Sequence, residues 1–235
     1  MVRTLGRILT SGLHPVQFRD FFLCDILSSL TYTFSALEIF FCSVWAGFNN
    51  IADQCQFHGS WAVPAVTAIP AYFRFIQCVR RYYDERVIWP HLPNAMKYVL
   101  SLTTIFLSTN ARNNRTPASL ALWLVAAFTT AFYAWWWDVY FDWSFVQRDR
   151  TAKYGFKWRK QHFPYKWVYW AVPIQNFILR LSFIILISPN QWGLFIGSRT
   201  LVWIMALFEL WRRVVWCIFR MENEHNTNVG RFRAT

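Results

Sequence analysis

Charged side chains are scarce in this chain. Asp, Glu, Lys and Arg make up only 15% of its 235 residues, whereas roughly 25% is usual in soluble domains. Apolar residues account for 55% and aromatic residues for 20%. So little charge with so much apolar and aromatic surface argues against a soluble domain. It favours a protein in a lipid bilayer, where Trp and Tyr also gather at the interfaces.

The sequence also lacks the patterns that usually carry catalysis or bind a metal. Its five cysteines form no CxxC pair and have no histidine partner at zinc spacing. No Gly-rich phosphate loop, Ser-His-Asp order or setting for a Cys nucleophile is present. The sequence therefore predicts a protein that is not an enzyme and has neither a metal nor a cofactor. The cysteines in apolar runs are interpreted as small packing residues.

The excess of basic residues does not indicate nucleic acid as a partner. The net charge is +12, but the cations lie between apolar runs and form no long basic arm. Anionic lipid on a cytoplasmic membrane face, or an anionic substrate, fits this distribution better. The N-terminal segment has no long apolar core followed by a small-residue cleavage site, so no cleaved signal peptide is expected.

Apolar runs dominate the rest of the chain and predict its fold class. About 20 residues cross a bilayer as a helix, and Pro64 and Pro70 in the second run predict a kink or a break there. The sequence predicts an all-α polytopic membrane protein, a bundle of about six transmembrane helices between a cytoplasmic segment 1–20 and a cytoplasmic polar tail 220–235. The six runs cover residues 21–48, 61–79, 97–110, 117–137, 168–189 and 195–219.

Connections that are rich in Lys and Arg alternate along the chain with connections that contain few or none. The connections 49–60 and 190–194 contain neither residue, and the connection 111–116 contains only Arg112 and Arg115. The segments on the other side are rich in both, above all the long basic and aromatic connection 143–166. Cytoplasmic segments carry such an excess of Lys and Arg, so both termini are expected in the cytoplasm. The connection 143–166 is expected to lie along the cytoplasmic membrane surface.

Charged residues inside the apolar runs are the strongest functional candidates, because a charge in a bilayer is costly. Arg74 and Arg180 lie within separate runs, and an arginine fork matches the oxygens of a phosphate. The functional hypothesis is a polar path in which cations attract an anion and carboxylates hold the cations in place. The alternative is that the charges only pair with one another and fix helix packing. The candidate set is Asp25, Arg74, Lys97, Asp138, Asp142, Arg180, Glu209, Arg212 and Arg213.

Two spacings in this set predict neighbours within one helix. Glu209 can meet an arginine three or four residues later, at Arg212 or Arg213. Asp138 and Asp142 lie one helical turn apart, and so on one face. Such a carboxylate pair could bind metal, as in some membrane transferases. Because no further acidic motif accompanies it, capping of cationic neighbours is the preferred interpretation.

Three segments of the chain resemble the motifs of a known family. They read PVQFRDFFLCDILSSLTYTF near the start, RFIQCVRRYYDE…PHLPNAMKY in the middle and FELWRRVVWCIFRMENEHNTNVGRFRA at the end. Together they resemble the EXS domain, the membrane core of eukaryotic phosphate exporters related to the xenotropic and polytropic retrovirus receptor. The likeness extends from about residue 14 to residue 234 with the motifs in the same order.

The resemblance implies a six-helix bundle with a path for inorganic phosphate. The path would involve the charged residues named above and, in addition, Tyr98. The resemblance further implies a homodimer and an SPX-containing partner or a preceding N-terminal region, in the plasma membrane or the Golgi. Two residues depart from exporters of the animal type, because Ser28 replaces an Asn and Phe183 replaces a Trp.

The main hypothesis is export or conduction of inorganic phosphate through an arginine-lined path. The alternative is a non-conducting Golgi membrane factor for protein retention or sorting. That factor would use the connection 143–166 and the tail 220–235 as docking surfaces. A third hypothesis is a membrane-embedded transferase that uses Asp138 and Asp142.

Overall fold

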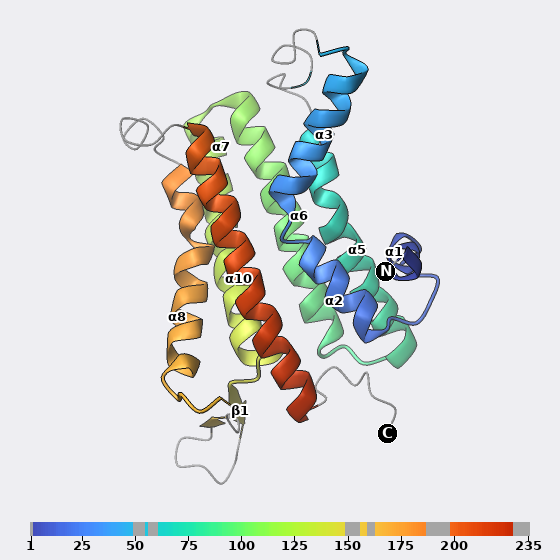
Figure 1. Ribbon diagram of the computed structural model, residues 1–235, viewed down its shortest axis with the longest axis vertical. Coiled ribbons are helices and arrows are strands. Elements are labelled where there is room, and N and C mark those ends of the chain that lie inside the picture. The colour runs from blue at the N-terminus through green and yellow to red at the C-terminus, as the bar shows by residue number, and fades with distance from the viewer. Residues whose placement is uncertain are drawn as a thin grey trace. The chain divides into compact units, whose positions relative to one another are not determined.

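The computed structural model describes residues 2–48, 55, 61–148, 156–158, 163–186 and 198–227. The described residues are almost wholly helical, which confirms the predicted all-α class. The chain divides into two compact units, Met1–Thr130 and Ala131–Thr235, with the boundary inside one long helix. Figure 1 shows the elements of both units along the chain.

The first unit is built from helices. α5 and α6 run side by side along much of their length, and α2 and α3 both pack against α5 (Figure 1). The bounds are Val2–Leu9 for α1, Phe18–Leu27 for α2, Thr31–Trp45 for α3, Ala62–Glu85 for α5, His91–Asn114 for α6 and Pro117–Trp137 for α7.

The first predicted run, 21–48, is not one straight helix. It forms α2 and α3, which are bent by 68° at a short break. The hydroxyl of Ser28 donates to the carbonyl oxygen of Asp25 at 2.7 Å at this break. Serine side chains that bond to nearby backbone compete with helix continuation, and Ser29 follows directly.

The second predicted run is one continuous helix, so of the predicted kink or break the break is wrong and the kink stays a prediction. Pro64 lies in the first turn of α5, where an N–H would have no helical acceptor in any case. Pro70 lies inside the same helix, which continues through it to Glu85. The third predicted run is longer than expected, because α6 extends over 24 residues.

Membrane-spanning length and composition are found in several of these helices. Among the described residues, Ala62–Glu85 and Pro117–Asp142 are long and apolar enough to cross a bilayer, and the bent pair of α2 and α3 makes a third if it is one span. α6 is also long enough, but it carries more polar side chains and is not apolar enough to qualify as a span by the same criterion. The count of six spans therefore stays a prediction.

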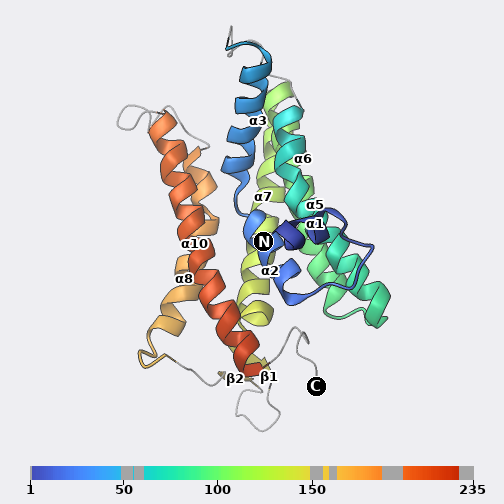
Figure 2. The same ribbon diagram turned by 45° about the vertical axis from the view of Figure 1, so that its right-hand side comes forward.

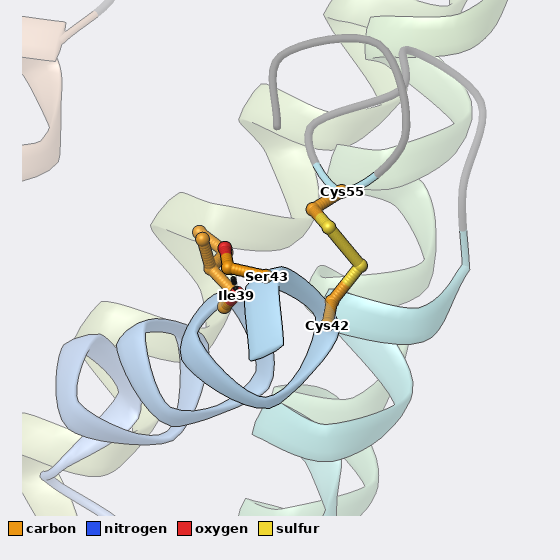
Figure 3. The surroundings of a disulfide bond; sticks show 4 residues. All are labelled: Ile39, Cys42, Ser43 and Cys55. Carbon is orange, nitrogen blue, oxygen red and sulfur yellow. Dashed lines mark hydrogen bonds between the residues drawn. A yellow bond between two sulfur atoms is a disulfide. The ribbon is translucent and has the colours of Figure 1, made fainter. Parts of the chain in front are cut away.

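A disulfide joins Cys42 at the end of α3 to Cys55 in the following connection (Figure 3). Cys42 lies in the first apolar run, so the interpretation as a packing residue is wrong for it, whereas the buried and free Cys24 and Cys78 agree with that interpretation. Disulfides persist in oxidising compartments. The connection 49–60 is the one that the Lys and Arg pattern predicts on the non-cytoplasmic side, so two independent observations agree.

The second unit begins in the last turns of α7. A π-helix, η1, covers Asp138–Asp142 and is followed by a two-stranded antiparallel sheet that pairs Gln147 with Lys157. α8 and α10 run side by side, and the two strands lie near one end of α10 (Figure 2). The bounds are Val146–Arg148 for β1, Phe156–Trp158 for β2, Val168–Arg180 for α8, Ser182–Leu186 for the 3-10 helix η2 and Ser198–Thr227 for α10.

Aromatic side chains form the interior at the end of α10. Phe145 lies 5.3 Å from Phe219 and 5.4 Å from Tyr169 between ring centroids, and Trp143 is fully buried. The start of the connection 143–166 thus packs inward and does not lie on a membrane surface. α10 also continues to Thr227, so the first part of the predicted tail is helical. Residues 187–197 and 228–235 lie outside the described residues.

Candidate functional site

A buried arginine organises the first unit. Arg74 on α5 is only 2% exposed and lies on the helix face that also carries Ala71 and Gln77. Its Nε donates to Asp25 Oδ1 at 3.2 Å and to the Tyr98 hydroxyl at 2.9 Å. Its Nη1 donates to Gln77 Oε1 at 2.7 Å. Three helices, α2, α5 and α6, therefore converge on one guanidinium.

The surroundings of Arg74 hold it in one orientation. The Tyr98 hydroxyl donates to Asp25 Oδ1 at 2.6 Å, which closes a triangle with the guanidinium. The rings of Phe21 and Tyr98 lie 4.6 Å and 4.9 Å from Arg74 Cζ. Such cation–π contacts strengthen when they are removed from water. The side chain is thus pre-positioned by charge, hydrogen bonds and packing together.

The third nitrogen of the Arg74 guanidinium, Nη2, differs from the other two. Nη2 is buried and has no hydrogen-bond acceptor among the described residues. A buried donor without an acceptor costs about 1–3 kcal/mol, and more when it is charged. Lys97, also buried, places Nζ 5.1 Å from the centre of the Tyr98 ring. Two cations therefore lie beside the Tyr98 ring, and an anionic oxygen would satisfy Nη2 of Arg74.

A second arginine, with its side chain 15% exposed, organises the other unit. Arg180 on α8 donates through Nη2 to Asp138 Oδ2 at 2.5 Å. Asn176, one turn earlier on α8, donates to the same oxygen at 3.0 Å. Asp138 and Asn176 are both almost fully buried. Nε of Arg180 is buried without an acceptor among the described residues, so this cation too has an unused donor.

The two aspartates that the sequence predicts on one face lie at the ends of a π-helix and bond to different helices. Trp143 N–H donates to the Asp138 carbonyl, five residues earlier, at 2.8 Å. Asp138 accepts from Asn176 and Arg180 on α8, while Asp142 accepts from Trp216 Nε1 on α10 at 3.3 Å. The two carboxylates therefore have different partners, and the shared face stays a prediction.

The arginines of α10 have different neighbours. Glu209 accepts from Arg212 Nε at 2.9 Å and from its Nη2, as the three-residue spacing predicts. Arg213 instead lies over the Trp216 ring, with Cζ 4.6 Å from its centre. Arg180 interacts electrostatically with both Arg212 and Glu209. The second unit therefore brings cations of α8 and α10 close to one another.

Comparison with known proteins identifies the family. The EXS family profile matches residues 1–226. The chain belongs to the EXS family. It is 37% identical over its whole length to the protein SYG1 of Saccharomyces cerevisiae, covering 27% of that protein. It is 34% identical to the xenotropic and polytropic retrovirus receptor 1 homolog of Xenopus laevis, again over its whole length and covering 36% of that protein.

A plant relative extends the comparison. The Arabidopsis thaliana phosphate transporter PHO1 homolog 8 is 32% identical over 98% of this chain, and the match covers 30% of the plant protein. This EXS-family chain therefore spans about a third or less of the length of these relatives. Membership in the family, together with the apolar helices, makes it a multi-pass membrane protein.

The structure brings the predicted residues together in groups. Asp25, Arg74, Lys97 and Tyr98 gather in the first unit. The second unit holds Asp138 with Arg180 and, on α10, Glu209 with Arg212. Arg213 and Asp142 both meet Trp216. Among the described residues no group of three or more His, Cys, Asp or Glu side chains could hold a metal ion.

Two buried amides and several residues of the predicted tail are absent from the candidate set. Gln77 and Asn176 are buried partners of the two arginines, but a single amide in an apolar run resembles an ordinary packing residue. Asn223, fully buried, donates to the Asp142 carbonyl at 2.8 Å and to the Ser144 hydroxyl at 3.0 Å. Arg220 pairs with Glu224 at 3.0 Å. The polar density of 220–227 is a signal for these contacts, although the sequence predicts only a cytoplasmic polar tail there.

Proposed function

We propose that this EXS-family chain translocates inorganic phosphate across a membrane, and that each unit supplies one binding station for it. The first station consists of Arg74 with Lys97 and Tyr98. The second consists of Arg180 with Arg212 and Arg213. Asp25, Asp138, Asp142 and Glu209 support these side chains. The names of the Arabidopsis relatives support phosphate as the substrate.

The observation that carries the proposal is the same in both units. An arginine, fully buried in the first unit and largely buried in the second, is held by one carboxylate, and one of its buried nitrogens remains without an acceptor among the described residues. Phosphate offers several strong acceptor oxygens, and a planar guanidinium can donate to them through parallel bonds. Helix packing alone would not require a buried donor to be left unused.

The carboxylates set how strongly each station binds the anion. Conduction requires binding that is strong enough for entry and weak enough for release. Asp25 and Asp138 compete with the anion for the guanidinium of Arg74 and of Arg180. They keep the cation in place when the station is empty, and they lower its affinity when phosphate is bound.

The test uses purified protein in liposomes loaded with phosphate. Arg74→Ala and Arg180→Ala are each expected to lower phosphate release at least tenfold, because a hydrogen bond to a charged group contributes about 1.5–3 kcal/mol. Arg74→Lys and Arg180→Lys keep the charge but lose the fork, and a smaller loss is expected. Arg3→Ala, at an exposed position on α1, is the control.

Equal release by wild type and by both alanine variants, with all proteins folded, would contradict the proposal. Folding is checked by size-exclusion chromatography and by the thermal unfolding midpoint in detergent. The lysine variants separate loss of function from loss of fold, because they avoid an uncompensated buried carboxylate.

A further inference from the structure

Gln77 is the neutral partner of Arg74. It lies three residues after Arg74 on α5 and is 2% exposed. Its Oε1 accepts from Arg74 Nη1 at 2.7 Å. Its Nε2 points the other way, towards the Asp20 carbonyl at 3.4 Å and the Ser11 hydroxyl at 3.5 Å. One amide thus joins the buried guanidinium to the first turn of α2, at Asp20, and to the segment before α2, at Ser11.

The segment before α2 is itself held against α5 by a hydrogen bond and by close packing. Arg80 Nη1 donates to the Gly12 carbonyl at 3.0 Å. Gly12 has a φ of +97°, and a Cβ added there would lie 3.0 Å from Ile76 Cγ2. Asp20 accepts from Arg7 Nε at 2.9 Å. The polypeptide against which Nε2 of Gln77 rests therefore has little freedom to move.

Gln77 differs from the other acceptors around Arg74 because it offers an uncharged amide oxygen. Nε faces the only carboxylate with a hydrogen bond to Arg74 among the described residues, Asp25, while Nη1 faces an uncharged oxygen. A carboxylate at position 77 would add a second negative charge against one guanidinium. An amide fixes the orientation of Nη1 without neutralising the cation, so Nη2 and the positive charge stay available.

We propose that Gln77 is a positioning residue for the phosphate station of the first unit. It holds Arg74 in the orientation that presents Nη2, and its neutrality keeps the affinity for the anion. The inference rests on the proposed function. It adds a residue that acts through Arg74 and ties the station to the segment Ser11–Asp20.

The experiment compares Gln77→Glu and Gln77→Met with the wild-type chain. Gln77→Glu keeps the length of the side chain but adds a charge, and Gln77→Met keeps the volume but removes all three hydrogen bonds. Gln147→Glu makes the same chemical change at an exposed residue of the other unit and is the control. Two quantities are measured: the phosphate concentration that gives half-maximal flux in liposomes, and the rise in thermal unfolding midpoint that phosphate causes in detergent.

Gln77→Glu is expected to raise the half-saturating phosphate concentration about tenfold or more, and to abolish most of the phosphate-dependent rise in midpoint. Gln77→Met should show a smaller increase, and Gln147→Glu should match the wild type. A purely structural role would lower the midpoint of the Gln77 variants without phosphate while leaving both phosphate dependences unchanged. That result would overturn the inference.

The flux of the wild type separates the two proposals. If wild-type liposomes release no phosphate, the proposed function fails. The role of Gln77 is then decided only by the phosphate-dependent rise in the thermal unfolding midpoint of the wild type and its variants. A phosphate-dependent rise in the wild type that Gln77→Glu removes would uphold Gln77 as a positioning residue for an anion site. No rise in the wild type, or an equal rise in wild type and variants, would overturn it.

Discussion

At the scale of single residues, the two interpretations of the buried charges both describe part of the structure. Arg74 pairs with Asp25 and Arg180 pairs with Asp138, as the helix-packing alternative expects. Each pair nevertheless leaves one guanidinium nitrogen without an acceptor among the described residues. A pair that served packing alone would gain from a further acceptor, because buried donors are normally satisfied.

The strength of these pairs can be tested at Asp138. Asp138→Asn removes the buried carboxylate that pairs with Arg180, whose side chain is only 15% exposed, and removal of one partner of a buried pair costs about 3–5 kcal/mol. A clear fall in the thermal unfolding midpoint is expected. Asp84→Asn is the matched control, because Asp84 pairs with Arg80 at 2.8 Å but is partly exposed, and exposed pairs contribute only about 0–1 kcal/mol. Equal shifts in both variants would contradict the assignment of Asp138.

At the scale of elements, local chemistry explains where the helices depart from simple apolar runs. The first run bends where Ser28 bonds back to the chain, and α7 ends in a π-helix whose last carbonyls accept from Asn223. The buried amide of Asn223 replaces helical hydrogen bonds at that point. α10 therefore continues as a helix beyond the predicted span because its polar side chains have partners.

The disulfide at the end of α3 gives a prediction at this scale. It closes a loop with a sequence separation of 13, and a cross-link over such a loop contributes about 3 kcal/mol in the chain-entropy model. Cys42→Ser is expected to lower the thermal unfolding midpoint of the purified protein. A reducing agent should lower the wild-type midpoint by the same amount and leave that of Cys42→Ser unchanged. A further fall in the variant would show that another group is responsible.

At the scale of the whole molecule, the alternation of Lys and Arg predicts which connections lie in the cytoplasm. Arg86 and Arg115 form a matched pair for testing it, because both are exposed helix C-caps with positive φ, 55° and 51°. An impermeant thiol reagent applied to intact cells or vesicles with the native orientation should label Arg115→Cys. It should label Arg86→Cys only after the membrane is opened. The wild-type chain gives the background, and labelling of both from one side would contradict the predicted topology.

The competing hypothesis of a sorting factor also belongs to this scale. It needs the connection 143–166 and the tail 220–235 as docking surfaces. The structure buries Trp143, Phe145 and Asn223, so the described beginnings of both segments serve the interior of the second unit. This leaves less of either segment available to a partner protein.

The sequence by itself determined the class of molecule and most of the candidate list. Composition and the length of apolar runs act through transfer to a bilayer, which depends on each segment alone. The family followed from motifs that are contiguous in the chain. The pair of Glu209 with Arg212 could be predicted for the same reason, because three residues along a helix fix the distance.

The tertiary structure alone decided which residue meets which. Asp25 and Arg74 are 49 residues apart, and Asn223 and Asp142 are 81 residues apart, so no local spacing links them. Asp138 and Asp142 bond to different helices, and Cys42 pairs with Cys55 although the connection between them carries no motif. Gln77 and Asn176 gained their roles only from the arginines beside them. Partner choice depends on how helices pack in three dimensions, and a one-dimensional pattern of charge and hydropathy does not contain that information.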